Sequence, residues 1–338
     1  MRNILLQYGL DDSDCTIRPL GNGLINTTWL VEMVKERYVL QKINDAIFKS
    51  PEDIAFNIRL MSCHLQQYHP GYFFVTPVQT TDGKDMVKNA EGYFRMFPFV
   101  KDAHTIDTVE RPGQAYEAAK QFGRFSRLLS GLDVAQLKIT LPHFHDLGLR
   151  YGQFEEALKT GHQERIEGSK ELIRFIIRQK NIADEFEFCK LNLTLRCTHH
   201  DTKISNILFD EAGKGLCVID LDTVMPGFFI SDVGDMMRTY LSPVSEEEND
   251  LSKIMVRREF YDAIVEGYLS EMKHELDDLE KKYFHYAGKF MIYMQALRFL
   301  TDHINNDRYY GARYEGHNFN RAANQIVLLE RLLEFNPG

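Results

Sequence analysis

The stretch from residue 198 to residue 238 constrains the fold of this chain more than any other part of its 338 residues. It holds two groups of acidic and amide side chains, His199-x-Asp201-x-x-x-x-Asn206 and Asp220-Leu221-Asp222. Between these groups, two short apolar runs flank the turn DEAGKG. The pattern predicts a two-stranded hairpin, with a polar loop before it and carboxylates at its far end.

Such a layout suits the transfer of a phosphoryl group to a hydroxyl. Because the transition state is loose, the protein mainly has to position groups and balance charge. One carboxylate must accept the proton of the acceptor, which suits Asp201, while an amide and a second carboxylate, Asn206 and Asp220, must hold Mg²⁺ against the triphosphate. Each of these residues alone fits an ordinary surface turn. Their combination beside two apolar runs favours a phosphotransferase site.

The motif HxDxxxxN followed by IDxD resembles the aminoglycoside phosphotransferase and choline kinase superfamily, the small-molecule branch of the kinase-like fold. The segments THHDTKISNILFD, VIDLDTVMPG and DVGD are similar to those of its N-acetylhexosamine 1-kinase branch. The same holds for GNGLINTTWLV, YVLQKIN, HFHD and the region around RFLTD. The resemblance extends over most of the chain, from residue 17 to residue 330.

The resemblance implies an α+β, bilobal, protein-kinase-like fold of the aminoglycoside phosphotransferase type, with a small antiparallel-sheet lobe and a large, mostly helical lobe. We expect residues 1–100 to form the nucleotide-binding lobe and residues 101–338 the catalytic and substrate-binding lobe. The implied activity is ATP- and Mg²⁺-dependent phosphorylation of an amino sugar, at the anomeric hydroxyl of an N-acetylhexosamine. The resemblance implies that Asp222 binds a second metal ion or supports the metal ligands. It also implies that Asp232 braces the catalytic loop.

Composition excludes several other classes of partner. The net charge of −9 argues against a nucleic-acid surface, although local cations and Mg²⁺ still allow a nucleotide to bind. The five dispersed cysteines include no CxxC pair, which suits a reducing cytoplasm. No apolar run reaches the roughly 18 residues that span a bilayer, and the first residues lack the pattern of a signal peptide. We therefore expect a cytoplasmic protein with neither a membrane nor a nucleic-acid partner.

A glycine-containing turn near the N-terminus separates two strand-like runs. It consists of Gly21-Asn22-Gly23, with Asn26 and Thr27 just beyond. Glycine has no Cβ, so backbone N–H groups in such a turn can approach phosphate oxygens closely. An ordinary Asn-Gly hairpin has the same pattern. Together with the downstream site, the turn is interpreted as the loop over the nucleotide phosphates.

The next expected strand, Arg37–Ile43, contains the position where a kinase-like fold normally places a cation for the phosphates. In the superfamily pattern this position falls on Gln41 and not on Lys42, and the sugar-kinase branch is similar in carrying a glutamine there. Because strand side chains alternate, the two residues cannot face the same side. We favour Gln41 and interpret Lys42 as a solvated charge.

Further elements complete the small lobe. Ser50-Pro51 is typical of a helix start, and strands are expected over residues 72–78 and 92–100. The second of these, GYFRMFPFV, suits the last strand of the lobe and the link to the larger one. An adenine can lie against such a link, so Phe97 and Phe99 are candidate nucleotide contacts. An ordinary core position is equally compatible with both.

Helical patterns dominate after residue 102, and two features there bear on a substrate. HFHD at residues 143–146 offers two histidines, but no cysteine or third histidine at ligand spacing supports a metal site. Arg298 and Asp302 lie four apart on the expected last long helix and can form a surface ion pair. The resemblance makes Arg298 and Tyr309 sugar-binding candidates, since a guanidinium donates several hydrogen bonds and an aromatic ring can stack on a pyranose.

Three alternatives remain open. The acceptor can be another small molecule, such as an aminoglycoside, choline, homoserine or a plain hexose, although Arg298 opposes a cationic acceptor. A catalytically dead ATP-binding regulator would turn over no acceptor. A phosphohydrolase would release phosphate without any acceptor.

Overall fold

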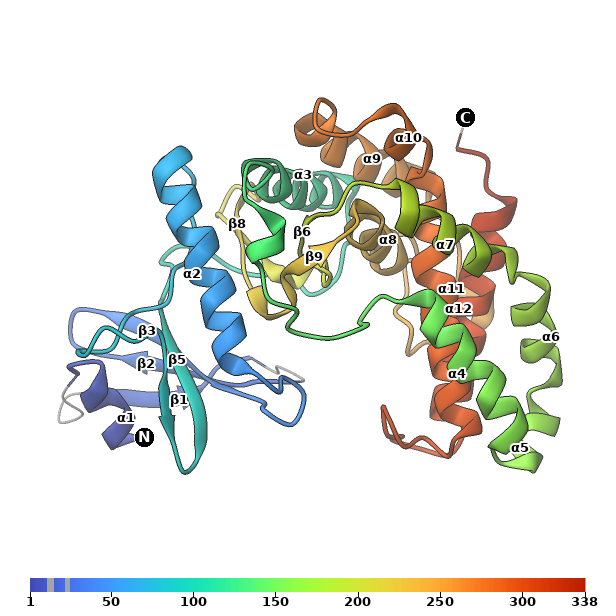
Figure 1. Cartoon of the computed structure of the whole chain (residues 1–338), viewed down its shortest axis with the longest axis horizontal. Coiled ribbons are helices and arrows are strands. Elements are labelled where there is room, and N and C mark those ends of the chain that lie inside the picture. Colours follow the sequence, from blue (N-terminus) through green and yellow to red (C-terminus); the bar gives the residue numbers. More distant parts are fainter. Residues whose placement is uncertain (11–14, 22–24, 338) are drawn as a thin grey trace. The chain divides into compact units, whose positions relative to one another are not determined.

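The structure is a computed structural model that describes residues 1–10, 15–21 and 25–337, and the chain divides into two compact units (Figure 1). Unit 1 consists of residues 1–104, 131–142 and 208–226, and unit 2 contains the remaining segments, 105–130, 143–207 and 227 onward. Two later segments therefore pack with unit 1, whereas the sequence assigned everything after residue 100 to one lobe. The assignment of the first lobe to the nucleotide stays a prediction.

Unit 1 is built on a five-stranded sheet with the order β1-β2-β3-β5-β4. All neighbouring strands are antiparallel, as expected for the small lobe. The strands are β1 Thr16–Pro19, β2 Thr27–Glu32, β3 Arg37–Ile43, β4 Val87–Asn89 and β5 Gly92–Pro98. Alternate residues of these strands, among them Val31, Leu40 and Phe94, form an apolar core together with Ile4 and Leu5 of helix α1 (Arg2–Gln7).

Helix α2 (Pro51–Tyr68) begins where the sequence predicted, with Ser50 as the N-cap residue and proline in the first turn. It buries an apolar stripe of Ile54, Ile58, Met61 and Leu65 at helical spacing. The strand expected over residues 72–78 was wrong. That segment is extended but contributes only an isolated bridge, from Val78 to Met96 of β5.

The predicted hairpin after the first polar group is confirmed. Strand β7 (Ile207–Phe209) pairs with β8 (Gly215–Val218), and the Asp210 carboxylate holds the turn by accepting the backbone N–H groups of Ala212 and Lys214. Around the hairpin lie the short elements η2 Val134–Gln136, η4 Leu221–Thr223 and β9 Met225–Gly227.

Unit 2 is mostly helical, as expected for the larger lobe. Its longer helices are α3 Pro112–Leu128, α4 Leu147–Thr160, α6 Lys170–Arg178, α7 Asn181–Asn192, α8 Phe229–Tyr240, α9 Arg258–Met272, α11 Phe284–Ile304 and α12 His317–Glu334. Its shorter elements are α5 Gln163–Gly168, β6 Arg196–Thr198, η3 Ile204–Asn206, η5 Leu251–Lys253 and α10 Asp278–Lys282. Helix α11 is the central helix of this unit, because it contacts α4, α8 and α12 (Figure 1). None of the described helices has the length and apolar composition needed to cross a bilayer.

Small residues allow the helices of unit 2 to approach closely. A Cβ atom added to Gly267 of α9 would lie 2.4 Å from the carbonyl oxygen of Tyr116 on α3. A Cβ on Gly234 of α8 would lie 2.3 Å from the carbonyl oxygen of Ala287 on α11. Both neighbours are rigid helical backbone. Glycine is therefore required at these positions for packing and not for backbone flexibility.

We predict that Gly267→Ala destabilises unit 2 by about 2 kcal/mol, because overpacking against backbone outweighs the gain in helix propensity. The matched control is Gly152→Ala in α4, where a new Cβ meets nothing within 4 Å, so stability should rise by up to about 1 kcal/mol. Urea unfolding followed by circular dichroism at 222 nm measures both changes. Equal effects of the two substitutions would contradict the packing explanation.

Candidate active site

In unit 2, the start of the HxDxxxxN loop is held by the carboxylate of Asp232 in the first turn of α8. Its two oxygens accept the backbone N–H groups of His199 at 3.1 Å and of His200 at 2.8 Å. His200 has a φ of +68°, a left-handed conformation that non-glycine residues rarely adopt. Burial raises the pKa of Asp232 to about 7, against the two N–H bonds that lower it. Asp232 thus has the bracing role expected from the sequence.

Thr202 is bound at each of its polar groups. Its backbone N–H donates to the Asp235 carboxylate at 2.8 Å, and its hydroxyl donates to the carbonyl oxygen of Asp232 at 2.7 Å. Its own carbonyl oxygen accepts the hydroxyl of the buried Tyr240 at 2.5 Å. Three residues of α8 therefore determine the path of the loop immediately after Asp201.

Asp201 lies between an amide and an ammonium group. The side-chain nitrogen of Asn206 donates to the Asp201 carbonyl oxygen at 2.8 Å and to its Oδ2 at 3.2 Å, while Lys203 Nζ lies 3.0 Å from Oδ1. The spacing of four residues thus brings Asp201 and Asn206 together, as predicted. Lys203 was missed by the sequence reasoning. Its position two residues after Asp201 was the available signal.

These contacts determine the charge of Asp201. Burial alone would raise the pKa of its carboxyl, but the charge and hydrogen bond of Lys203, with smaller effects of His199 and Arg238, lower it below the ordinary value. The carboxylate in turn raises the pKa of Lys203. Asp201 is therefore ionised at neutral pH, and each carboxylate oxygen has a second lone pair with which to accept a proton.

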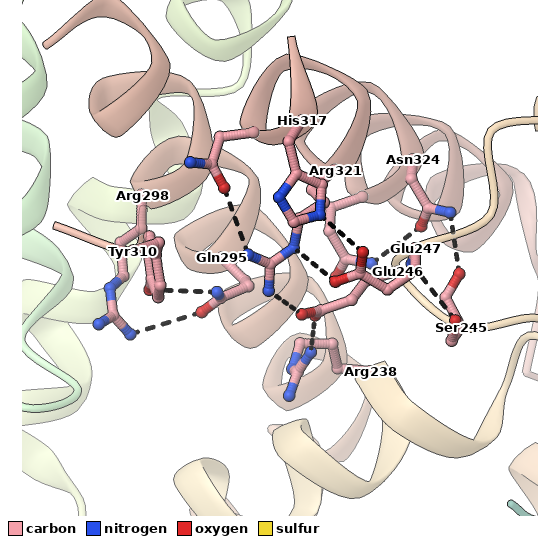
Figure 2. A network of polar contacts seen from close by, with 12 residues as sticks. Arg238, Ser245, Glu246, Glu247, Gln295, Arg298, Tyr310, His317, Arg321 and Asn324 are labelled. Atoms are coloured by element: carbon pink, nitrogen blue, oxygen red, sulfur yellow. Dashed lines mark hydrogen bonds and ion pairs between the residues drawn. The ribbon is translucent and has the colours of Figure 1, made fainter. Parts of the chain in front are cut away.

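A chain of ion pairs connects α8 to α12 (Figure 2). Arg238 binds Asp235 at 2.9 Å and Glu246 at 2.7 Å, and Arg321 of α12 pairs with Glu246 on its other side. Glu247 accepts a 2.6 Å hydrogen bond from His317. The acidic segment after α8 is thus neutralised by cations of two helices, and the support of the Asp201 loop extends to the end of the chain.

In unit 1, Asp222 is the centre of a buried polar cluster. Arg95 Nη1 lies 2.5 Å from its Oδ1, and the side-chain amide of Asn26 donates to its Oδ2 at 2.7 Å. Arg95 also donates from Nε and Nη2 to the Gln41 side-chain oxygen, at 3.0 and 2.9 Å. Both side chains of the ion pair are almost fully buried, with 3% and 2% of their surfaces exposed.

The cluster places Gln41, and not Lys42, on the side of Asp222. Lys42 points to the other face of the strand, with its ammonium 5.9 Å from the Phe94 ring. The cation beside Gln41 is Arg95 of β5, which is directly opposite Gln41 in the strand register. Sequence reasoning missed Arg95. A single charged residue inside the apolar run GYFRMFPFV was the signal.

The predicted metal ligands differ in their engagement. Both oxygens of Asp222 already bind Arg95 and Asn26, whereas the side chain of Asp220 is exposed at a left-handed position with φ of +58°. In unit 2, the Asn206 nitrogen is used by Asp201, and its Oδ1 accepts no hydrogen bond from the described part of the chain. A carboxylate and an amide oxygen are ligands that Mg²⁺ accepts, usually alongside substrate phosphates. Asp222, whose two oxygens already have donors, is therefore less suited to this ion, and the roles of Asn206 and Asp220 stay predictions.

A metal site at HFHD has no support. No cluster of three or more His, Cys, Asp or Glu side chains suited to a metal occurs within residues 1–10, 15–21 and 25–337. Asp146 instead caps α4 by accepting the N–H of Leu149 at 3.1 Å, and its other oxygen lies 3.2 Å from His143 Nδ1.

The remaining predicted nucleotide contacts lie in unit 1, and their roles stay predictions. Asn22 and Gly23 fall outside the described residues. Gly21 has a φ of +70° and precedes that gap, and Thr27 begins β2. Phe97 and Phe99 are half-buried and lie under the guanidinium groups of Arg95 and Arg37, at 5.0 and 4.1 Å.

The two sugar-binding candidates of unit 2 come together. Arg298 Nη2 donates to the Tyr309 hydroxyl at 3.3 Å, and both residues line a pocket of about 390 Å³ with Arg150 and Tyr310. The alternative ion pair between Arg298 and Asp302 is not formed. Asp302 instead accepts the backbone N–H groups of Tyr309 and Tyr310, at 2.8 and 2.9 Å. The Asp302 carboxylate therefore stabilises the turn after α11, and the Arg298 guanidinium lines the pocket without an ion pair to Asp302.

Comparisons with known proteins identify the family and the fold. A family model described as "Phosphotransferase enzyme family" matches residues 16–279. One similar solved structure is an aminoglycoside phosphotransferase from Alicyclobacillus acidocaldarius, with a TM-score of 0.67, 13% sequence identity and coverage of 99% of this chain and 95% of that one. A microcompartment-associated aminopropanol kinase has a TM-score of 0.62 and 18% identity, with coverage of 98% of this chain and 95% of that one. A spectinomycin phosphotransferase in complex with ADP and spectinomycin has a TM-score of 0.59 and 13% identity, with coverage of 98% of this chain and 96% of that one. The expected bilobal fold is confirmed by these matches.

We predict that Arg95→Met destabilises unit 1 by about 3–5 kcal/mol, because it leaves the Asp222 charge buried without a partner. Trp29, the only tryptophan, lies in β2, so its fluorescence during urea unfolding reports on this unit. The control is Arg59→Met, since the partly exposed Arg59–Asp85 pair should contribute less than about 1 kcal/mol. Adding Asp222→Asn to Arg95→Met should recover part of the loss. Similar losses for Arg95→Met and Arg59→Met would disprove the assignment.

We predict that Lys203→Met raises the pKa of Asp201, because burial then acts without the ammonium charge that offsets it. The titration of ¹³Cγ-labelled aspartate, followed by NMR, should move to higher pH. Lys190→Met is the control, since Lys190 pairs with Glu187 at 3.0 Å and touches no residue of the Asp201 loop. An Asp201 titration that is the same in both variants would show that Lys203 has no such effect.

Proposed function

The chain belongs to the phosphotransferase enzyme family, as a small-molecule phosphotransferase of the aminoglycoside phosphotransferase and choline kinase type, and from this membership we propose its donor and acceptor. The donor is ATP with Mg²⁺, and the acceptor is the anomeric hydroxyl of an N-acetylhexosamine. The observation that carries the proposal is the loop of unit 2 in which an ionised Asp201 is held by Asn206 and Lys203.

Asp201 is the proposed general base. Its lowered pKa keeps the carboxylate free of protons near neutral pH, so it can orient the acceptor hydroxyl and take its proton as the phosphoryl group arrives. The bonds from Asp232, Asp235 and Tyr240 to residues 199, 200 and 202 support this role, since they hold the loop in one conformation before substrate binds.

Asn206 and Asp220 are the proposed magnesium ligands, and Asp222 is proposed to support them or to bind a second ion. A bound Mg²⁺ would neutralise charge on the phosphates of the nucleotide. Asp222 would act through Arg95, whose guanidinium it holds together with Gln41. Gly21, Asn22, Gly23, Asn26, Thr27, Gln41, Phe97 and Phe99 are the proposed nucleotide contacts.

Arg298 and Tyr309 are the proposed sugar-binding residues. Their pocket combines guanidinium donors with aromatic rings, a composition that suits a pyranose. A cationic acceptor such as choline or an aminoglycoside would meet Arg150 and Arg298 in the same pocket, and like charges repel. This charge favours the sugar over the cationic acceptors.

The test is an acceptor panel with ATP and Mg²⁺, followed by ³¹P NMR. It contains N-acetylglucosamine, N-acetylgalactosamine, glucose, choline, kanamycin, spectinomycin and 1-amino-2-propanol. We expect a sugar-1-phosphate signal from an N-acetylhexosamine. Turnover of only a cationic acceptor would refute the sugar. Phosphate release without any acceptor would favour a phosphohydrolase, and an unchanged ATP signal would favour a regulator.

We predict that Asp201→Asn lowers kcat by about 10²- to 10⁴-fold, since the amide cannot accept the proton. Circular dichroism should remain that of the folded protein. The matched control, Asp184→Asn, changes an exposed aspartate on α7 and should retain full activity. An active Asp201→Asn variant would remove the assignment of the base.

A further inference from the structure

The pocket of about 390 Å³ in unit 2 has an unusual balance of charge. It lies between α4, α11 and the turn that follows α11, and it is lined by two arginines, Arg150 and Arg298, and two acids, Glu156 and Asp302. The formal charges cancel. What matters for a ligand, however, is which of these groups already have partners within the protein.

Both acids of the pocket are engaged. Asp302 is buried, and besides the N–H groups of Tyr309 and Tyr310 it accepts the side-chain amide of Asn318 at 3.1 Å. Three donors thus compensate its charge. Glu156 is exposed on α4 and pairs with Lys159 one turn later, at 3.6 Å. Neither carboxylate forms an ion pair with a pocket arginine.

Both arginines lack a carboxylate. Arg150 donates to the side-chain oxygen of Gln153 at 3.0 Å and to the carbonyl oxygen of His143 at 3.1 Å, while its buried Nε has no hydrogen-bond partner within the described ranges. Arg298 donates to Gln295 and Tyr309, at 3.4 and 3.3 Å. All these acceptors are neutral. Two half-buried guanidinium groups therefore lie in one pocket without an ion pair among the described residues, an arrangement that a ligand with a counter-charge would complete.

The guanidinium charges of Arg150 and Arg298 lower the pKa values of nearby groups. Burial and the charge of Arg298 lower the pKa of Arg150. The pKa of His145 is held well below its usual range by burial, by His200 and by Arg298, Arg238 and Arg150. His145 is therefore neutral, and the guanidinium groups are the source of the positive potential in this region.

A series of side-chain contacts connects Arg298 to the Asp201 loop. The Arg298 guanidinium lies 5.9 Å from the Phe144 ring, and Phe144 stacks on His145 with 4.4 Å between ring centroids. The Nδ1 atoms of His145 and His200 are 3.3 Å apart, and His200 directly precedes Asp201. All these contacts lie within unit 2. Contacts through Phe144, His145 and His200 therefore connect the pocket residue Arg298 to the loop of the proposed base.

We propose that the acceptor carries an anionic oxygen group, a carboxylate or a phosphate ester, that Arg150 and Arg298 bind together. The inference rests on the proposed function and narrows its acceptor to an amino sugar with an acidic substituent. A guanidinium presents parallel N–H donors that match carboxylate and phosphate oxygens. A neutral sugar would satisfy donors but leave both charges uncompensated.

The first experiment compares matched acceptors that all keep a free anomeric hydroxyl. N-acetylglucosamine is the neutral parent, N-acetylmuramic acid and 2-acetamido-2-deoxyglucuronic acid add a carboxylate at different positions, and N-acetylglucosamine 6-phosphate adds a phosphate ester. We expect kcat/KM to be at least about tenfold higher for one or more of the anionic sugars than for the parent, mainly through a lower KM. Comparison of the carboxylates with the phosphate ester identifies the anion.

The second experiment assigns that preference to the two arginines. Arg150→Gln and Arg298→Gln should each reduce the preference for the anionic sugar, the ratio of its kcat/KM to that of the neutral parent, by about tenfold or more. The matched control is Arg174→Gln, an exposed arginine of α6 that pairs with Glu171 outside the pocket. It should preserve the preference. Circular dichroism establishes that each variant is folded.

The outcomes separate this inference from the proposed function. A parent sugar that is used as well as every anionic analogue overturns the inference and leaves the kinase assignment intact, and so does a preference that survives both arginine substitutions. If no sugar is phosphorylated, the proposed function fails, and titration calorimetry without nucleotide decides the inference. Tighter binding of an anionic sugar that is lost in Arg150→Gln supports the pocket, and equal or absent binding overturns it.

Discussion

The carboxylates of Asp232 and Asp235 on α8 are the constraint on which the rest of unit 2 depends. A loop that must present Asp201 in one conformation cannot satisfy its backbone N–H groups within a helix or strand, so it needs acceptors from elsewhere. The two aspartates supply them to residues 199, 200 and 202. Buried acids need counter-charges in turn, and Arg238, Glu246 and Arg321 extend this requirement as far as α12. A catalytic loop of a few residues is in this way tied to helices distant in the sequence.

Charge compensation distinguishes supporting groups from groups that await a ligand. In unit 1, Arg95 and Asp222 neutralise each other at a position closed to solvent, and Gln41 and Asn26 complete their hydrogen bonds. In unit 2, the chain from Asp235 to Arg321 is likewise balanced. Arg150 and Arg298 form no ion pair among the described residues, and the acids in their pocket are engaged with other donors. The two arginines and the ionised Asp201 have the partial exposure that substrate binding requires.

Much of the architecture was predictable from residue patterns. The apolar stripe of α2, the start of that helix at Pro51, the extent of α3 and the β7–β8 hairpin follow from spacing and turn residues. The segment 72–78 misled because its aromatic and β-branched composition suits a strand, yet only Val78 finds a strand neighbour. The amino-acid composition of a segment indicates only that it can adopt a strand. Whether a partner edge lies within reach depends on the remainder of the sheet.

The sequence by itself determined the family and the bilobal fold, because its motifs extend over most of the chain. It also determined the pairing of Asp201 with Asn206, because this pairing depends on the short spacing within one loop. Only the tertiary structure decided which cation accompanies Gln41, since Arg95 reaches it through strand register over a long loop. Only the tertiary structure likewise decided the partners of Asp302, which accepts backbone N–H groups of the turn after α11 and does not pair with Arg298. Spacing along the sequence indicates which side chains can form a contact. Competition among all the donors brought together by folding decides which of them do, because a buried carboxylate binds the donors that compensate its charge best.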